Sequence, residues 1–278
     1  MDGLKLNQTE KEKILESVKY SKNVCILIDY DNLFYTFKRY AIDVTDDSYN
    51  IGKFFNLLYG MDKIRSFRAY ADFEQVAVSL RNLQEQRIQI RNVYGNNRND
   101  QFRKNASDIE LSMDAIEMTH REPNIDTYVI VTSDSDMIPV MSRLKYKGKT
   151  VHLFYASENS SQVTHFESYC DISCDLIKLF NVNTAVGSPN YWYQTVIDIV
   201  NNWHNDEKNK KYTLWFNWLK KQIVSTCHVS EFYAVEIIND MFQNKLLQKL
   251  PVPNSNDCNI IVVDENSKNY WHYLLVVV

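Results

Sequence analysis

The chain has 278 residues, of which 45% are hydrophobic and 24% charged, and its net charge is −4. These values are typical of a folded protein with room for one large domain and a smaller one, and they exclude a chain that is disordered throughout. The negative net charge gives no general attraction for nucleic acid, so such a partner would have to be met by local basic patches.

The first part of the chain alternates strand-like and helical segments. Short apolar or β-branched runs predict strands at Val24–Asp29, Ile64–Ala71, Ile88–Tyr94, Tyr128–Thr132 and Thr150–Tyr155. Amphipathic spacing predicts helices at 10–20, 31–40, 50–59, 74–86, 107–120, 135–147 and 161–169. Such alternation predicts an N-terminal helix at 1–21 and then, over 22–182, a parallel sheet covered by helices on both faces.

The pattern changes after a break at 181–190, where Gly187 and Pro189 interrupt it. Helices are expected at 191–204, 212–226 and 230–246, followed by apolar runs with turn signals at Leu247–Val263 and Tyr270–Val278. Three helices followed by a hairpin are the outline of a winged helix. The sequence therefore predicts an α/β domain followed by a smaller, winged-helix-like α+β domain at 190–278.

Acidic residues gather where two of the predicted strands end. Asp29 ends the first strand, Asp134 and Asp136 follow the fourth, and Asp108 opens the helix at 107–120. Because the carboxyl ends of parallel strands meet at one edge, these carboxylates are expected to converge if the strands are neighbours. A divalent cation would relieve their repulsion, and ligands that are all oxygen favour Mg²⁺ or Mn²⁺. Such ions serve the hydrolysis of phosphodiester bonds.

Other readings of these residues stay open. Each aspartate alone is more typical of a helix start, where a carboxylate caps the first turn, whereas the ordered set favours a site. Asn32 is expected to orient Asp29 or a phosphate oxygen. Asp114 lies six positions after Asp108, about 120° around the helix, so it either acts near the metal or pairs with a basic residue.

The ordered motifs resemble the NYN domains of the LabA-like type, a branch of the PIN-like nucleases. The resemblance is carried by Asp29-Tyr30-Asp31-Asn32, by Lys104…Asp108…Asp114, by Thr132-Ser133-Asp134-Ser135-Asp136 with Pro139, and by the segment Ser168–Leu179. It implies a Rossmann-like α/β/α fold and RNA cleavage that depends on Mg²⁺ or Mn²⁺. It places Asp29, Asp108, Asp134 and Asp136 in the metal and catalytic site, with Asn32 and Ser133 in support and Asp114 at a position that is often acidic. The interval from Lys104 to Asp108 is one residue longer than the family pattern.

The segment before Asp108 is the expected RNA contact. It contains Arg91, Arg98, Arg103 and Lys104 among Asn and aromatic residues, which suit phosphates and stacked bases. A solvated loop with incidental charge is the alternative.

The terminal domain, residues 190–278, contains eight lysines and nine acidic residues, a net charge of −1. It is therefore as well suited to a protein partner or homodimer as to RNA. It weakly resembles the LOTUS-type modules that accompany some NYN domains.

The sequence thus favours an endoribonuclease, with two alternatives. A haloacid-dehalogenase-like phosphatase also places Asp-x-Asp after a strand, but its further Lys and Gly-Asp motifs have no counterpart here. A non-catalytic RNA-binding or scaffold protein of the same fold is the other. We expect a cytoplasmic protein for three reasons. The five cysteines are scattered, which suits a reducing compartment. The apolar runs are too short to span a membrane, and the charged N-terminus has no signal-peptide pattern.

Overall fold

The computed structural model describes residues 3–76, 78–93, 106–156, 166–209, 212–251 and 259–264. The chain forms two compact units, one of residues 1–37 and 43–182 and the other of residues 38–42 and 183–278. Within the described ranges, no helix has both the length and the apolar character needed to cross a membrane.

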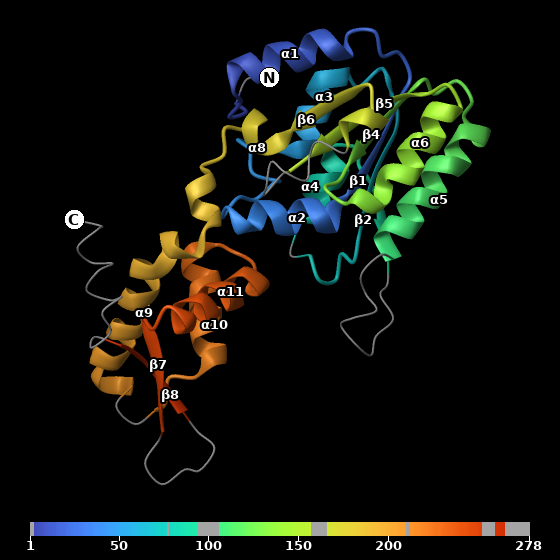
Figure 1. Cartoon of the computed structure of the whole chain (residues 1–278). Coiled ribbons are helices and arrows are strands. Elements are labelled where there is room, and N and C mark those ends of the chain that lie inside the picture. Colours follow the sequence, from blue (N-terminus) through green and yellow to red (C-terminus); the bar gives the residue numbers. More distant parts are fainter. Residues whose placement is uncertain are drawn as a thin grey trace. The chain divides into compact units, whose positions relative to one another are not determined.

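The first unit is built on a six-stranded sheet in the order β3-β2-β1-β4-β5-β6, and every neighbouring pair of strands is parallel (Figure 1). Its strands are β1 (Val24–Asp29), β2 (Ile64–Ala71), β3 (Gln89–Asn92), β4 (Thr127–Val131), β5 (Thr150–Tyr155) and β6 (Ile172–Asp175). The strand order reverses between β1 and β4, and in open parallel sheets ligands bind outside the carboxyl ends of the strands at such a point. Ile28 of β1 pairs with Val131 of β4, so the segments that follow both strands begin side by side.

Helices cover both faces of this sheet (Figure 1). On one face α5 (Ala106–Arg121) and α6 (Ile138–Tyr146) pack on alternate residues of the strands, and their cluster includes Cys25, Leu27, Leu111 and Met141. On the other face Phe54 and Phe55 contact Phe154, and their helix, α3 (Ile51–Tyr59), is joined by α1 (Gln8–Val18), α2 (Tyr30–Arg39), α4 (Leu80–Glu85) and α8 (Leu176–Leu179). The predicted α/β fold is confirmed, and its core is apolar on both sides of β1 and β4.

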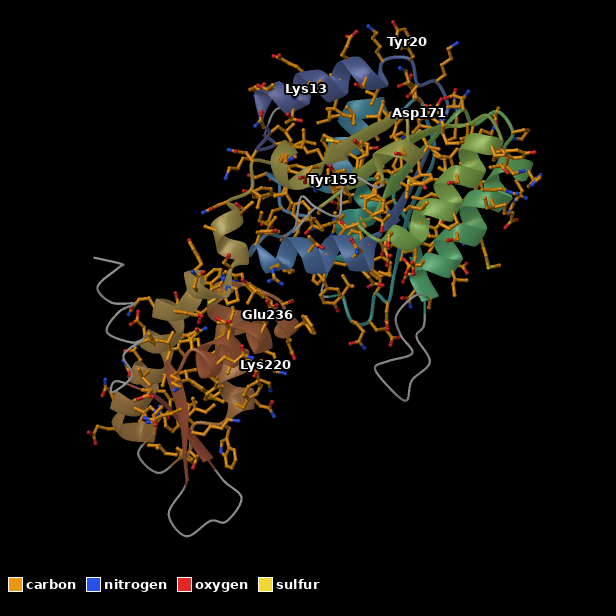
Figure 2. All side chains as sticks on the ribbon, in the orientation of Figure 1. Lys13, Tyr20, Tyr155, Asp171, Lys220 and Glu236 are labelled. Atoms are coloured by element: carbon orange, nitrogen blue, oxygen red, sulfur yellow. The ribbon has the colours of Figure 1, made fainter. Side chains whose placement is uncertain are left out.

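Polar contacts fix the far edge of the sheet. Asp171, labelled in Figure 2, accepts hydrogen bonds from Lys145 Nζ and from the backbone N of Val151, the latter at 2.8 Å. One carboxylate therefore joins α6, the start of β5 and the segment that leads into β6.

Several element bounds agree with the sequence. Strands β1, β2 and β5 have the predicted limits, β4 begins and ends one residue earlier, and β3 is shorter than predicted. Strand β6 was not predicted, because four residues are too few to show an alternating pattern.

One predicted helix is wrong in part, and another begins with a 3-10 turn. In the part of 74–86 that the structure describes, only α4 is helical, because Asp72 organises a turn: its Oδ1 accepts a hydrogen bond of 3.2 Å from Glu74 N and its carbonyl accepts from Gln75 N and Val76 N. The helix expected at 135–147 is a short 3-10 turn, η1 (Ser135–Met137), followed by α6 with Pro139 in its first turn, where a missing N–H costs little. Of the segment 161–169 the structure describes only the end, which contains the 3-10 helix η2 (Glu167–Tyr169).

The second unit contains three α-helices and a hairpin in its described residues. These are α9 (Tyr193–Asn205), α10 (Phe216–Cys227), α11 (Glu231–Gln243), and the antiparallel strands β7 (Leu247–Pro251) and β8 (Asn259–Val263), with the 3-10 turns η3 (Thr184–Gly187), η4 (Pro189–Trp192) and η5 (Glu207–Asn209). Buried residues of all three helices and of β8 share one apolar cluster. The elements follow the predicted order. The apolar run at Tyr270–Val278 lies outside the described residues.

Candidate active site

Asp29 lies buried at the end of the central strand, 2% exposed. Since side chains alternate along a strand, it is on the same face as Cys25 and Leu27, the face covered by α5. Its Oδ2 accepts a hydrogen bond of 2.8 Å from Thr132 Oγ1, and its Oδ1 accepts one of 3.3 Å from Asn32 N. Asp29 therefore caps α2, as the alternative reading of the sequence allowed, and also faces the neighbouring strand end.

Thr132 links the two acidic strand ends. Besides donating to Asp29, its buried Oγ1 accepts a hydrogen bond of 3.0 Å from Asp134 N. Asp134 in turn caps η1, because its Oδ1 accepts a hydrogen bond of 2.9 Å from Asp136 N. Thr132 was not among the predicted site residues; the signal that could have found it is its place directly after an apolar strand and two residues before Asp134.

Asn32 and Ser133 hold three strand ends together. Asn32 Oδ1 accepts a hydrogen bond of 3.1 Å from Ser133 N, and Ser133 Oγ donates to Ala156 O at 2.9 Å and accepts from Ala156 N at 3.0 Å. These bonds connect the residues after β1, β4 and β5. Both residues are thus placed to support the edge on which Asp29 and Asp134 lie.

Asp108 reaches the same edge from the first turn of α5. It lies three and seven residues before Leu111 and Ala115, which are both buried against the sheet, so it shares their side of the helix. Burial raises the pKa of Asp108, and the negative charge of Asp134 raises it further, while a hydrogen bond with Asp29 acts in the opposite direction. The charge of Asp136 raises it as well. The structure therefore brings Asp29, Asp108, Asp134 and Asp136 into one electrostatic neighbourhood.

The pKa of Asp29 reflects the negative charge gathered at this edge. Burial raises the pKa of Asp29 to about 8, and the charge of Asp108 adds to the increase, against hydrogen bonds from Thr132 and Asn32 that lower it. Ionising both Asp29 and Asp108 at neutral pH costs free energy unless a cation lies between them. The pair thus has the electrostatic character of a cation site.

Asp114 has a different environment. Its Oδ2 accepts hydrogen bonds of 2.7 Å from Arg68 and 2.6 Å from Tyr70, and Arg91 Nε lies 3.6 Å away. The side chains of Arg68 and Asp114 are only 12% and 14% exposed. Of the two roles that the sequence left open, the structure shows the pair with a basic residue.

The predicted RNA contacts are only partly described. Arg91 is on β3 with 43% of its side chain exposed. Arg98, Arg103 and Lys104 lie outside the described residues.

The donor set fits a hard divalent cation. No three His, Cys, Asp or Glu side chains in the described part of the chain form a ready-made metal cluster. Mg²⁺, however, is commonly held by one or two carboxylates together with water and substrate phosphates. Asp29 and Asp108 supply two carboxylates, and a bound cation would offset the negative charges of neighbouring carboxylates that raise the pKa of each.

The chain is similar to known proteins in two respects. The family model of the NYN domain matches residues 23–177. A crystal structure of a protein of unknown function from Vibrio parahaemolyticus is 17% identical in sequence, covers 56% of this chain and 94% of its own, and gives a TM-score of 0.38. No curated protein matches the chain.

Proposed function

This chain belongs to the NYN domain family, within the PIN-like nuclease superfamily, and we propose that it is a metal-dependent endoribonuclease. The observation that supports the proposal most is the meeting of the buried Asp29 with the half-buried Asp108 at the carboxyl edge of the sheet, where neighbouring carboxylates raise the pKa of both residues. The switch in strand order between β1 and β4 is where a parallel sheet binds its ligands.

In the proposed site Asp29 and Asp108 hold Mg²⁺ or Mn²⁺, and Asp134 and Asp136 add negative charge beside them. When bound, such an ion supplies the positive charge that a phosphodiester needs in order to approach this edge and be hydrolysed. Thr132 holds Asp29 in place. Asp136, which is exposed, is the carboxylate most open to substrate and solvent.

RNA as the substrate is supported by the family and by basic residues that precede α5 in the sequence. Arg91 is exposed on β3, and Arg98, Arg103 and Lys104 stand in the sequence between β3 and α5. Cations there would attract a phosphate backbone toward an acidic site that otherwise repels it. RNA binding by these four residues is part of the proposal.

We also propose that residues 22–182 act as the nuclease domain and that 190–278 form a winged-helix-like domain that contacts RNA, a protein partner or a second copy. Phe232 and Trp215 support a contact role, because 77% and 49% of their surface is exposed. Large exposed aromatic side chains are frequent at interfaces.

The experiment is a cleavage assay with Mn²⁺ on single-stranded RNA, single-stranded DNA and duplexes of one sequence. We expect the wild type to cut RNA, and Asp29→Asn and Asp134→Asn to lose at least about a hundredfold in rate, a loss typical of removing a group that stabilises the transition state. The exposed Asp47→Asn serves as the matched control, and melting temperatures in EDTA check the fold.

The alternatives predict other results. Release of inorganic phosphate from a small ester, without any effect on RNA, would favour the phosphatase. Tight RNA binding with no cleavage under any divalent ion would favour the non-catalytic protein. Full activity of either site variant would contradict the assignment of the site.

A further inference from the structure

Asp31 makes a three-way contact next to the proposed site. It lies in the first turn of α2, and its Oδ2 accepts hydrogen bonds of 2.8 Å from Ser107 Oγ and 3.3 Å from Asp72 N. Asp72 directly follows β2, and Ser107 is in the first turn of α5. A single carboxylate oxygen therefore joins two helix starts and a strand end.

Ser107 is the residue before Asp108, so this contact fixes the turn that carries Asp108. Seven residues after Ser107, the pair of Asp114 with Arg68 ties α5 to β2 at 2.7 Å. Asp108 thus lies between two polar tethers, one in the first turn and one further along the helix. Of the two, the contact at Ser107 is the one in the turn that carries Asp108.

The first turn of α5 carries its carboxylate into negative surroundings. The charges of Asp134, Asp136 and Asp31 raise the pKa of Asp108, and repulsion from these charges acts to displace that turn from the sheet. Helix ends also fray more readily than helix centres. A hydrogen bond at Ser107 opposes this displacement at the residue next to Asp108.

The negative charge of Asp31 is unfavourable at this position, beside Asp29 and Asp108. Asp31 is another carboxylate beside two others, its own pKa is raised by burial, and its charge raises the pKa of both Asp29 and Asp108. Its favourable contribution in the described structure is as a hydrogen-bond acceptor for Ser107 and Asp72. An acceptor without charge should therefore serve in its place.

We propose that Asp31 is a positioning residue for Asp108, which it holds through the hydroxyl of Ser107, and that this contact sets the affinity of the site for its divalent cation. The inference rests on the proposed function. Groups that orient a metal ligand typically change metal affinity by about 10- to 100-fold when they are removed.

The test is calorimetric titration of the full chain with Mn²⁺ in the absence of RNA, together with cleavage rates measured over a range of Mn²⁺ concentrations. We expect Asp31→Ala and Ser107→Ala each to weaken Mn²⁺ binding by about tenfold, with kcat recovered at saturating Mn²⁺. The double variant should bind no more weakly than either single variant, since both remove the same contact.

Conservative variants separate positioning from charge. Asp31→Asn keeps an acceptor oxygen and Ser107→Thr keeps the hydroxyl, so both should bind Mn²⁺ nearly as well as the wild type. If Asp31→Asn weakens binding as much as Asp31→Ala while Ser107→Ala has no effect, Asp31 acts through its charge and the inference is wrong. Asp47→Ala is the control for loss of an acid elsewhere on the first unit.

The outcomes also distinguish this inference from the proposed function. A wild type that binds Mn²⁺ and cuts RNA, with unchanged Mn²⁺ binding in Asp31→Ala and Ser107→Ala, overturns the inference alone. A wild type that neither binds Mn²⁺ nor cuts RNA overturns the proposed function and the inference with it. Melting curves show whether Asp31→Ala still folds, and Ser107→Ala tests the same bond by removing only one hydroxyl.

Discussion

The hydroxyl of Thr132 donates a hydrogen bond of 2.8 Å to the buried carboxylate of Asp29. The same oxygen accepts a hydrogen bond of 3.0 Å from Asp134 N. The bond to Asp29 is shielded from water, because Asp29 and Thr132 are each only 2% exposed. The strand ends that carry two acids of the proposed site are thus joined through one side chain.

Replacing Thr132 by Val should lower the free energy of unfolding by about 1–3 kcal/mol, because it leaves a buried carboxylate oxygen and a backbone N–H without a partner. Thr132→Ser, which keeps the hydroxyl, should lose much less. Urea denaturation at neutral pH measures both. Equal stability of the two variants would show that the hydroxyl is not a stabilising link.

Mn²⁺ should stabilise the protein more at pH 8 than at pH 5. The pKa of Asp29 is raised from 3.8 to about 8 in the folded protein, so the folded state holds a proton that the unfolded state releases. This stabilisation is complete below pH 4 and is lost as the pH rises through 8. Mn²⁺ binds to Asp29 in place of that proton. At high pH the proton competes less with Mn²⁺ for the carboxylate, so the cation stabilises the folded state more.

The measurement is the melting temperature with and without Mn²⁺ at pH 5 and pH 8. In Asp29→Asn the residue no longer titrates, so the shift that Mn²⁺ produces should be small at both values. A shift that is larger at pH 5 than at pH 8 would contradict the proposed competition between proton and cation.

His152 should make the protein less stable in acid. Its imidazole Nδ1 lies 2.7 Å from Tyr59 Oη in the core, and burial lowers the pKa of His152 from 6.5 to about 4, although the charges of Asp171 and Asp126 act in the opposite direction. The stability that depends on the neutral ring is therefore complete above pH 6.5 and is lost as the pH falls through 4.

Over part of this range Asp29 changes the stability in the opposite direction, so the wild-type curve alone does not separate the two groups. The difference in unfolding free energy between the wild type and His152→Gln, measured from pH 4 to 7, isolates the histidine. We expect that difference to shrink as the pH falls. Tyr59→Phe, which keeps the titrating ring, should leave the pH dependence largely in place.

Asp114→Ala should weaken the fold and leave the cation site nearly intact. The carboxylate is engaged by Arg68 and Tyr70, and its loss leaves a mostly buried guanidinium without its partner. We expect about 1–3 kcal/mol of destabilisation and Mn²⁺ affinity within about threefold of the wild type, less than the loss expected on removing a group that orients a metal ligand. Asp108→Ala should show the reverse, with lost Mn²⁺ binding and a stable fold. Calorimetry measures Mn²⁺ binding by both variants, and urea denaturation measures their stability. If Asp114→Ala loses Mn²⁺ binding, Asp114 belongs to the metal site after all.

Much of the site could be predicted because it follows from local pattern. The apolar run Val24–Ile28 followed by Asp29, and Tyr128–Val131 followed by Asp134, can each be recognised without a partner segment. Parallel strands place their carboxyl ends at one edge, so the convergence of these acids follows from the alternation of strands and helices. The NYN resemblance, found in the same motifs, is confirmed over residues 23–177.

Other features depend on contacts between distant segments. The sequence left Asp114 open between a metal and a cation partner, and only the packing of α5 against β2 brings Arg68 to it. The contact of Asp31 with Ser107 joins residues 76 positions apart, and that of Thr132 with Asp29 joins residues 103 apart. The sequence by itself determined which acids end the strands, because strand periodicity is a local property. Only the tertiary structure decided which of those acids share a charge environment and which side chains hold them, because hydrogen-bond partners are chosen by the way the sheet and its helices pack.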